Sequence, residues 1–138
     1  GLVIRYSFLW SHEAARGERE GSKARPCAII VSAMQEDSGK IRVTVAPITH
    51  APPSEQSLCL PVPSGVARSL DLDGDPQWFR FDEINHFEWP GFDLRPLPDR
   101  PGEVTYGLLP KPLFEKIRDQ IFENARNRKL KSVINRDE

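Results

Sequence analysis

The sequence predicts a mainly β fold of the α+β class, in which five or six short strands form a small, partly open barrel and the chain ends in a helix. Thirteen prolines among 138 residues exclude long helices from most of the chain, because proline lacks the N–H that a helix interior needs. Apolar residues instead recur in short, strand-like runs. From Pro112 onward their spacing changes to that of a helix.

The chain, residues 1–138, is expected to form one domain, since its length is close to that of a typical single domain. A hydrophobic fraction of 38% and a charged fraction of 28% are typical of soluble proteins. No apolar run approaches the roughly 20 residues of a membrane span. No secretion signal opens the chain, so we expect a cytoplasmic protein.

The first half of the chain contains three predicted strands, at residues 2–10, 27–33 and 41–48. The first is rich in β-branched and aromatic residues, and the second is an apolar run suited to a central strand. In the third, apolar and polar residues alternate as in a half-buried strand. Between the first two lies the polar stretch SHEAARGEREGSKA, which we expect to be a functional loop because it is too long for a tight hairpin turn.

The second half is predicted to hold further strands and two helical segments. Residues 58–62 are a candidate strand, and residues 64–70 can form one or two helical turns with Ser64 as N-cap. Apolar and polar residues alternate again over residues 78–84, which predicts another strand. The Pro- and Gly-rich stretch that follows predicts an irregular surface excursion, and the pattern of residues 102–109 again favours a strand. An amphipathic helix closes the domain. The ordering of the basic tail, residues 126–138, is left open.

Charge and cysteine content limit the possible functions. A net charge of −1 offers no overall attraction to a polyanion, so nucleic-acid binding would depend on local patches such as residues 16–25, which contain Arg19 and Lys23. Cys27 and Cys59 lie in apolar surroundings without CxxC spacing, which predicts buried, reduced thiols. The three histidines show no metal-ligand spacing, and no phosphate-binding glycine loop or nucleophile elbow is present. We therefore expect no metal and no cofactor.

The polar residues at the predicted strand ends are the candidates for chemistry: Arg25, Thr49, His50, Arg80 and Asp82. Cleavage of RNA without a metal requires the 2′-hydroxyl to lose a proton, the 5′-oxygen to gain one, and the charged phosphorus to be stabilised. Arginines suit the stabilising role. Asp82 or His50 could accept the proton, and Thr49 could donate to a phosphate oxygen.

Taken one at a time, residues of these types more often have a structural role than a catalytic one. A threonine at a strand end is usually a β-former, and the tryptophans Trp10, Trp78 and Trp89 are more often core or interface residues than platforms for bases.

Four segments in order, GEREGSKARPCAIIV, VAPITH, WFRFDEI and PLFEKIRDQIFENA, resemble the signature of the MazF/PemK toxins of type II toxin–antitoxin systems, in the CcdB/PemK superfamily. The resemblance implies an SH3-like barrel, a homodimer, an antitoxin partner, and metal-independent cleavage of single-stranded mRNA. It places Arg25 and Thr49 at the catalytic positions of the family, and Arg80 and Asp82 at its acid–base pair. Glu18 falls in the substrate-facing loop. The predicted RNA-binding residues are Glu18, Arg19, Lys23 and His50.

The sequence departs from the family pattern at His50, where a serine or threonine is usual, and in the lengths of the first loop and of the excursion after Trp89. Two alternatives stay open. One is a toxin that binds DNA gyrase as the CcdB family does, although that family ends in Trp-Gly-Ile and this chain ends in SVINRDE. The other is a non-catalytic RNA-binding barrel.

Overall fold

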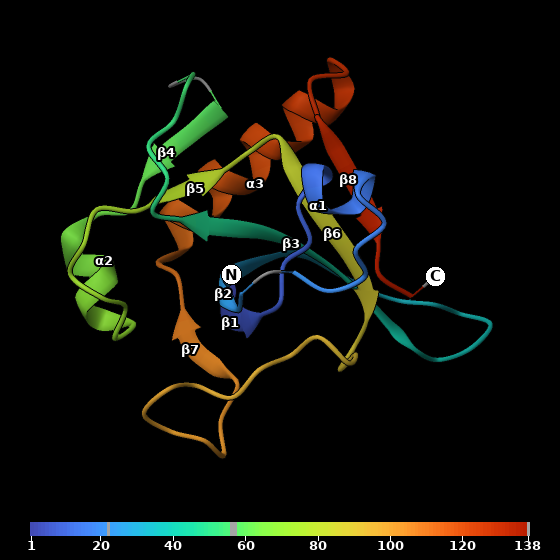
Figure 1. Ribbon diagram of the computed structural model, residues 1–138, viewed down its shortest axis with the longest axis horizontal. Helices are drawn as coiled ribbons and strands as arrows, with labels where there is room; N and C mark the ends of the chain where they lie inside the picture. The colour runs from blue at the N-terminus through green and yellow to red at the C-terminus, as the bar shows by residue number, and fades with distance from the viewer. Residues whose placement is uncertain (22, 56–57, 138) are drawn as a thin grey trace.

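The computed structural model describes residues 1–21, 23–55 and 58–137. Eight strands and three helices are distributed along these residues (Figure 1). In chain order they are β1 (Leu2–Tyr6), α1 (Ser11–Ala15), β2 (Arg25–Met34), β3 (Ile41–Thr49), β4 (Cys59–Pro61), α2 (Ser64–Ser69), β5 (Trp78–Arg80), β6 (Glu83–Glu88), β7 (Thr105–Leu108), α3 (Lys111–Arg126) and β8 (Ser132–Asn135).

The strands form one sheet that does not close on itself. The order along it is β4-β5-β3-β2-β1-β7, while β6 pairs with both β3 and β8. The neighbouring strands are antiparallel except for β6 and β8, which run parallel. The predicted mainly β, α+β fold with a partly open sheet and a C-terminal helix is confirmed.

The single strand predicted over residues 78–84 is wrong, because two strands share one edge of β3. Ile48 and Thr49 of β3 pair with β5, whereas its residues 42–45 pair with β6. The chain bends at Phe81 and Asp82 to pass from one pairing to the other. An alternating sequence pattern cannot reveal this bend, since the pattern continues through it.

The sheet is buried on both faces. One cluster fills the space between the sheet and α3, which lies behind the strands in Figure 1, and it includes Ala28, Ile48 and Ile117. A second cluster includes Tyr6, Trp10 and Phe87. Because successive strand residues face opposite sides, neighbours such as Cys27 and Ala28 divide between the two clusters.

The helix predicted from Pro112 onward is confirmed, and Pro112 lies in its first turn, where a missing N–H costs nothing. Ser64 is the first residue of α2 and not its N-cap, which is Pro63 without a side-chain hydrogen bond. None of the helices within the described residues is long and apolar enough to cross a membrane.

The structure differs from the expectation at the first strand and in the loop after it, and it shows how the tail is ordered. The first strand ends at Tyr6 and not at residue 10. The following loop contains α1, whose start is stabilised when the Glu13 carboxylate accepts a hydrogen bond from the Trp10 N–H over 3.1 Å. The basic tail forms β8 beside β6. Cys27 and Cys59 are buried free thiols, as predicted.

Stability is expected to fall in acid partly through His86. Its Nδ1 lies 2.7 Å from the Thr44 hydroxyl, and burial together with the charge of Arg42 lowers the pKa of the ring. The unfolded chain therefore takes up this proton at a higher pH than the folded protein, and stability present above about pH 6.5 is lost as the pH falls. Urea unfolding across this range should show a shallower pH slope for His86→Gln than for the wild type. Equal slopes would exclude the effect.

Candidate active site

Arg25 and Thr49 meet where β2 begins and β3 ends. The antiparallel register pairs Cys27 with Pro47. Arg25, two residues before Cys27, therefore lies opposite Thr49, two residues after Pro47. The Arg25 Nη1 donates to the Thr49 Oγ1 over 3.4 Å. The backbone N–H of Ala51 donates to the same oxygen over 3.2 Å. Thr49 is 5% exposed and Arg25 is half-buried, so the hydroxyl is held in a fixed position beneath the guanidinium.

The ring of Trp10 supports two of the predicted catalytic arginines. The guanidinium carbon of Arg25 lies 5.0 Å from the ring centroid, and that of Arg80 lies 5.4 Å from it. The indole is 8% exposed, and contacts of this length are within the range of cation–π attraction. Two positive charges from strands distant in sequence are thus held near each other by one aromatic ring.

Arg80 and Asp82 form a two-pronged ion pair. The Nε and Nη2 of Arg80 each donate to a different oxygen of Asp82, both over 2.9 Å. Glu83 lies 3.7 Å from Arg80 and accepts the backbone N–H of Ser11 over 2.7 Å. Arg80 and Asp82 thus meet at the bend between β5 and β6.

The two arginines differ in how easily they lose a proton. Burial lowers the pKa of Arg25, and the nearby Glu13 carboxylate opposes this only in part. Burial acts on Arg80 in the same direction, but the hydrogen bonds and charge of Asp82 outweigh it and raise the pKa of Arg80. Both guanidinium groups are positive charges, and the carboxylate of Asp82 stabilises the charge of Arg80 more than any neighbour stabilises that of Arg25.

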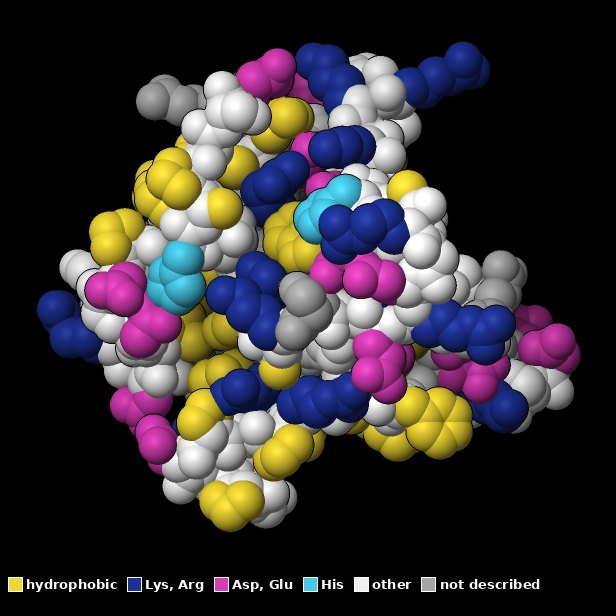
Figure 2. Space-filling view, in the orientation of Figure 1, with side chains coloured by type: hydrophobic (Ala, Val, Ile, Leu, Met, Phe, Trp, Pro, Cys, Tyr) yellow, Lys and Arg dark blue, Asp and Glu magenta, His cyan; other side chains and the backbone are white. Residues whose placement is uncertain are grey.

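An open cavity of about 630 Å³ lies next to Arg25. It is bounded by the ends of β1 and β2, by the segment after α2, and by residues 97–100 before β7. Lys and Arg side chains lie close together over the middle of the face shown in Figure 2. The charged residues and histidine that line the cavity are Arg5, Lys23, Arg25, His50, Asp71, Asp73, Asp99 and Arg100.

Two of the four predicted RNA-binding residues line this cavity, Lys23 and His50. The His50 Nε2 lies 2.8 Å from Asp73, and its Nδ1 lies 2.9 Å from the Pro76 carbonyl oxygen. His50 is adjacent to Thr49 in the chain, but its ring is directed to the segment after α2.

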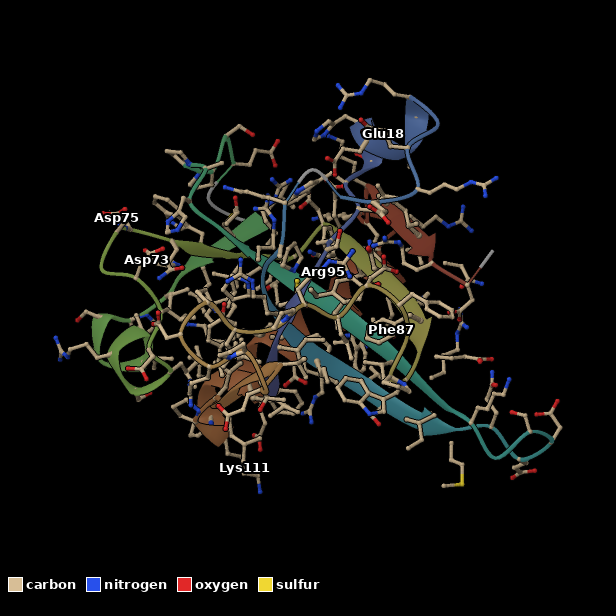
Figure 3. All side chains as sticks on the ribbon, turned by 60° about the horizontal axis from the view of Figure 1, so that its bottom comes forward. Glu18, Asp73, Asp75, Phe87, Arg95 and Lys111 are labelled. Atoms are coloured by element: carbon tan, nitrogen blue, oxygen red, sulfur yellow. The ribbon has the colours of Figure 1, made fainter. Side chains whose placement is uncertain are left out.

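Glu18 and Arg19 do not line the cavity. Glu18 is paired with Arg16 over 3.1 Å, and Figure 3 shows it beside α1, well apart from Asp73 on the cavity wall. The exposed Arg19 contributes its backbone oxygen to Arg136 over 3.0 Å. The structure therefore separates the first-loop residues Glu18 and Arg19 from Lys23.

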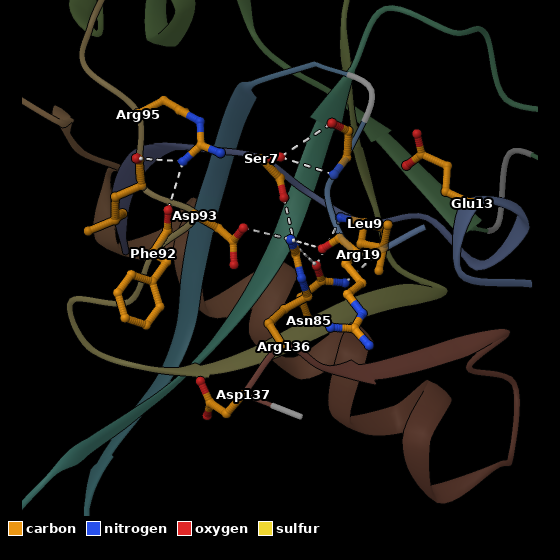
Figure 4. A network of polar contacts seen from close by, with 12 residues as sticks. Ser7, Leu9, Glu13, Arg19, Asn85, Phe92, Asp93, Arg95, Arg136 and Asp137 are labelled. Carbon is orange, nitrogen blue, oxygen red and sulfur yellow. Dashed lines mark hydrogen bonds and ion pairs between the residues drawn. The ribbon is translucent and has the colours of Figure 1, made fainter. Parts of the chain in front are cut away.

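A buried polar network around Arg136 was not foreseen from the sequence (Figure 4). Its side chain is 2% exposed and lies 2.8 Å from Asp93. The guanidinium also donates to the backbone oxygen of Ser7 over 2.6 Å, to the side-chain oxygen of Asn85 over 3.1 Å, and to the backbone oxygen of Arg19. The network ties the tail to the first loop and to the excursion after β6. The sequence carried no signal for it, because an arginine in a polar tail is usually solvated.

Within the described residues, no three His, Cys, Asp or Glu side chains come together in an arrangement that could hold a metal ion. Comparison of the chain with known protein families, with curated proteins and with solved structures gives no match.

Proposed function

We propose that the protein is a metal-independent endoribonuclease of the MazF/PemK toxin type that cleaves single-stranded RNA. The observation that supports this most is the contact of Arg25 with Thr49 at the edge of a cavity lined by further cations. The pair combines a fixed positive charge and a hydroxyl, which are the groups that a phosphodiester needs beside it when the 2′-oxygen attacks. The four ordered sequence segments support the same assignment.

In the proposed mechanism the scissile phosphate binds beside the Arg25–Thr49 pair, in contact with both side chains. The Thr49 oxygen accepts hydrogen bonds from Arg25 and Ala51, which leaves its O–H to donate to a phosphate oxygen. The guanidinium stabilises the additional negative charge that develops as the 2′-oxygen attacks phosphorus. The attack passes the 2′-hydroxyl proton to the proton acceptor, forms a 2′,3′-cyclic phosphate and breaks the bond to the 5′-oxygen, which takes up a proton from water.

Asp82 is proposed to orient Arg80. Both of its carboxylate oxygens already accept hydrogen bonds from Arg80, so accepting the 2′-hydroxyl proton would require that pair to open. Arg80, held over Trp10, then adds a second positive charge to the site. Both ring nitrogens of His50 also face acceptors, Asp73 and the Pro76 carbonyl oxygen, so His50 would likewise have to leave a partner. Asp82 and His50 are the two candidates for the proton acceptor.

A comparison of pH–rate profiles separates these two candidates. If His50 accepts the proton, His50→Ala should lower the cleavage rate and remove one limb of the profile. Thr49→Ala should lower the rate and keep the shape of the profile, because a threonine hydroxyl does not titrate in this range. An unchanged rate and profile in His50→Ala would exclude His50 and leave Asp82.

The proposed function is tested by incubating the protein with single-stranded RNA in excess EDTA. We expect cleavage that leaves cyclic phosphate and 5′-hydroxyl ends, and a loss of rate of about a hundredfold in Thr49→Val, which keeps the shape of the side chain but lacks the hydroxyl. Thr49→Ser should retain most of the activity. Intact RNA would contradict the nuclease, and intact RNA together with arrest of DNA gyrase would favour the gyrase-binding alternative.

The assembly and partners follow from the resemblance alone. We propose a homodimer with an SH3-like barrel in each subunit, an antitoxin protein that blocks the site, and mRNA in the cytoplasm as the substrate. Sedimentation of the purified chain tests the dimer independently of activity.

A further inference from the structure

The cavity beside Arg25 has walls of opposite charge. One wall is formed by β1, the loop before β2 and the start of β2, and it carries Arg5, Lys23 and Arg25. Within residues 1–21, 23–55 and 58–137, none of these three cations forms an ion pair with a carboxylate. This side of the cavity therefore carries a local excess of positive charge, although the whole chain has a net charge of −1.

The opposite side carries carboxylates. Asp71 and Asp73 follow α2, and Asp99 lies in the segment before β7. Asp73 is bonded to His50 over 2.8 Å, and Asp71 lies 4.0 Å from Arg100. A phosphate in the cavity would be attracted to the first wall and repelled from the second, so the charges give a ligand one preferred orientation.

Two guanidinium groups of this positively charged wall have a nitrogen without a hydrogen-bond partner among the described residues. The Nε atoms of Arg5 and Arg25 are shielded from solvent, and neither has a hydrogen-bond partner among the described residues. Shielding a charged donor without an acceptor is costly. An anion beside these two groups would be attracted by their charge, and phosphate oxygens match the fork of a guanidinium.

The rest of the lining suits a base. Tyr106, Leu97 and Pro98 provide flat or apolar surface, and aromatic rings are common stacking partners of bases in single strands. Burial raises the pKa of Tyr106, so its hydroxyl stays neutral and adds no negative charge. The volume of about 630 Å³ lies within the range typical of small-ligand sites.

We propose that this cavity is a subsite for the nucleotide next to the scissile phosphate, with its phosphate against Arg5 and Lys23 and its base toward the acidic side. The identification of the ligand as RNA rests on the proposed function. Arg25 provides the connection, because it both contacts Thr49 and lines the cavity. A strand whose scissile phosphate lies at the Arg25–Thr49 pair continues directly into this space.

Binding of a non-cleavable strand tests the subsite without relying on catalysis. The probe is a fluorescein-labelled 2′-O-methyl RNA of mixed sequence and about ten nucleotides, in which the attacking hydroxyl is blocked. Its Kd is measured by fluorescence anisotropy over a series of salt concentrations. The variants are Arg5→Gln, which keeps much of the side-chain length, and the exposed Lys23→Gln, which leaves the core untouched. Arg118→Gln is the matched control, since Arg118 lies on α3 beside Asp119 and outside the cavity.

We expect Arg5→Gln to weaken binding about tenfold and to lower the slope of log Kd against log salt by about 0.7, the value for one phosphate contact in a single strand. Lys23→Gln should lower the slope by a similar amount, and Arg118→Gln should bind like the wild type. Thermal unfolding of Arg5→Gln confirms that the fold is intact. If Arg5→Gln and Lys23→Gln both bind as tightly as Arg118→Gln, the subsite is excluded.

The two proposals can fail separately. RNA that is cleaved in EDTA while both cavity variants bind normally would remove the subsite and leave the nuclease. RNA that stays intact while both variants lose affinity would remove the nuclease and retain the cavity as a site for single-stranded RNA. A wild-type protein that does not bind the probe would exclude the subsite.

Discussion

Replacement of Arg25 by alanine is expected to lower the rate of RNA cleavage about a thousandfold under single-turnover conditions in excess EDTA. The guanidinium is the charged group that touches the Thr49 hydroxyl, and its attraction to the phosphate grows as negative charge develops there. An interaction that strengthens in the transition state lowers kcat when it is removed. The loss should therefore appear mainly in kcat and less in KM.

Two further variants separate the role of the charge from that of the shape. Arg25→Lys keeps the charge but loses the fork and the planar contact with Trp10, so we expect a rate between those of the wild type and Arg25→Ala. Arg118→Ala removes a partly exposed arginine of α3 that lies outside the site and should cleave normally. Because Arg25 is half-buried, unfolding of each variant is measured alongside. A folded Arg25→Ala protein with unchanged activity would contradict the proposed mechanism.

Replacement of Arg136 by methionine is expected to lower the free energy of unfolding by about 3 kcal/mol. The side chain is 2% exposed and its guanidinium is bonded to Asp93, Asn85 and two backbone oxygens. Methionine has a similar length but leaves Asp93 as a poorly solvated charge without this partner. Urea unfolding measures the difference, and Arg118→Met, at a partly exposed arginine, serves as the control. A loss no greater than that of the control would mean that the network contributes little.

The pH dependence of that loss provides an internal check. Burial raises the pKa of Asp93 even though Arg136 opposes the shift, so removal of Arg136 should raise this pKa further. For a carboxyl group with a raised folded pKa, the folded protein binds the proton more readily and stability falls as the pH rises. The penalty of Arg136→Met should accordingly be larger at about pH 7 than at about pH 4, where a protonated Asp93 needs no partner.

The contact between Arg25 and Thr49 could be foreseen because it depends on local and regular features. An arginine and proline that open one strand, and a threonine that ends the next, come together when two consecutive strands pair in antiparallel fashion. The apolar runs around Ile30 and Val45 predicted the two strands, and the structure shows that they pair. The C-terminal helix was equally predictable, since its apolar period extends over several turns.

The features that were not predicted depend on contacts between distant residues. The break between β5 and β6 arises because two strands share one edge of β3, and nothing in the alternation of residues 78–84 marks that point. The parallel pairing of β8 with β6 involves a short segment in a polar tail. Trp10 was expected to be a packing residue, which it is, but its contact with two arginines from separate strands required the structure.

The parallel pairing of β8 with β6 has a consequence for synthesis on the ribosome. Strand β6 is made well before residues 132–135 leave the exit tunnel, so one of its edges has no neighbour while translation continues. Open edges of this kind invite pairing with other nascent chains. Until Arg136 has been made, the backbone oxygens of Ser7 and Arg19 also lack the guanidinium that they bind in the folded protein, so the first loop is held less firmly.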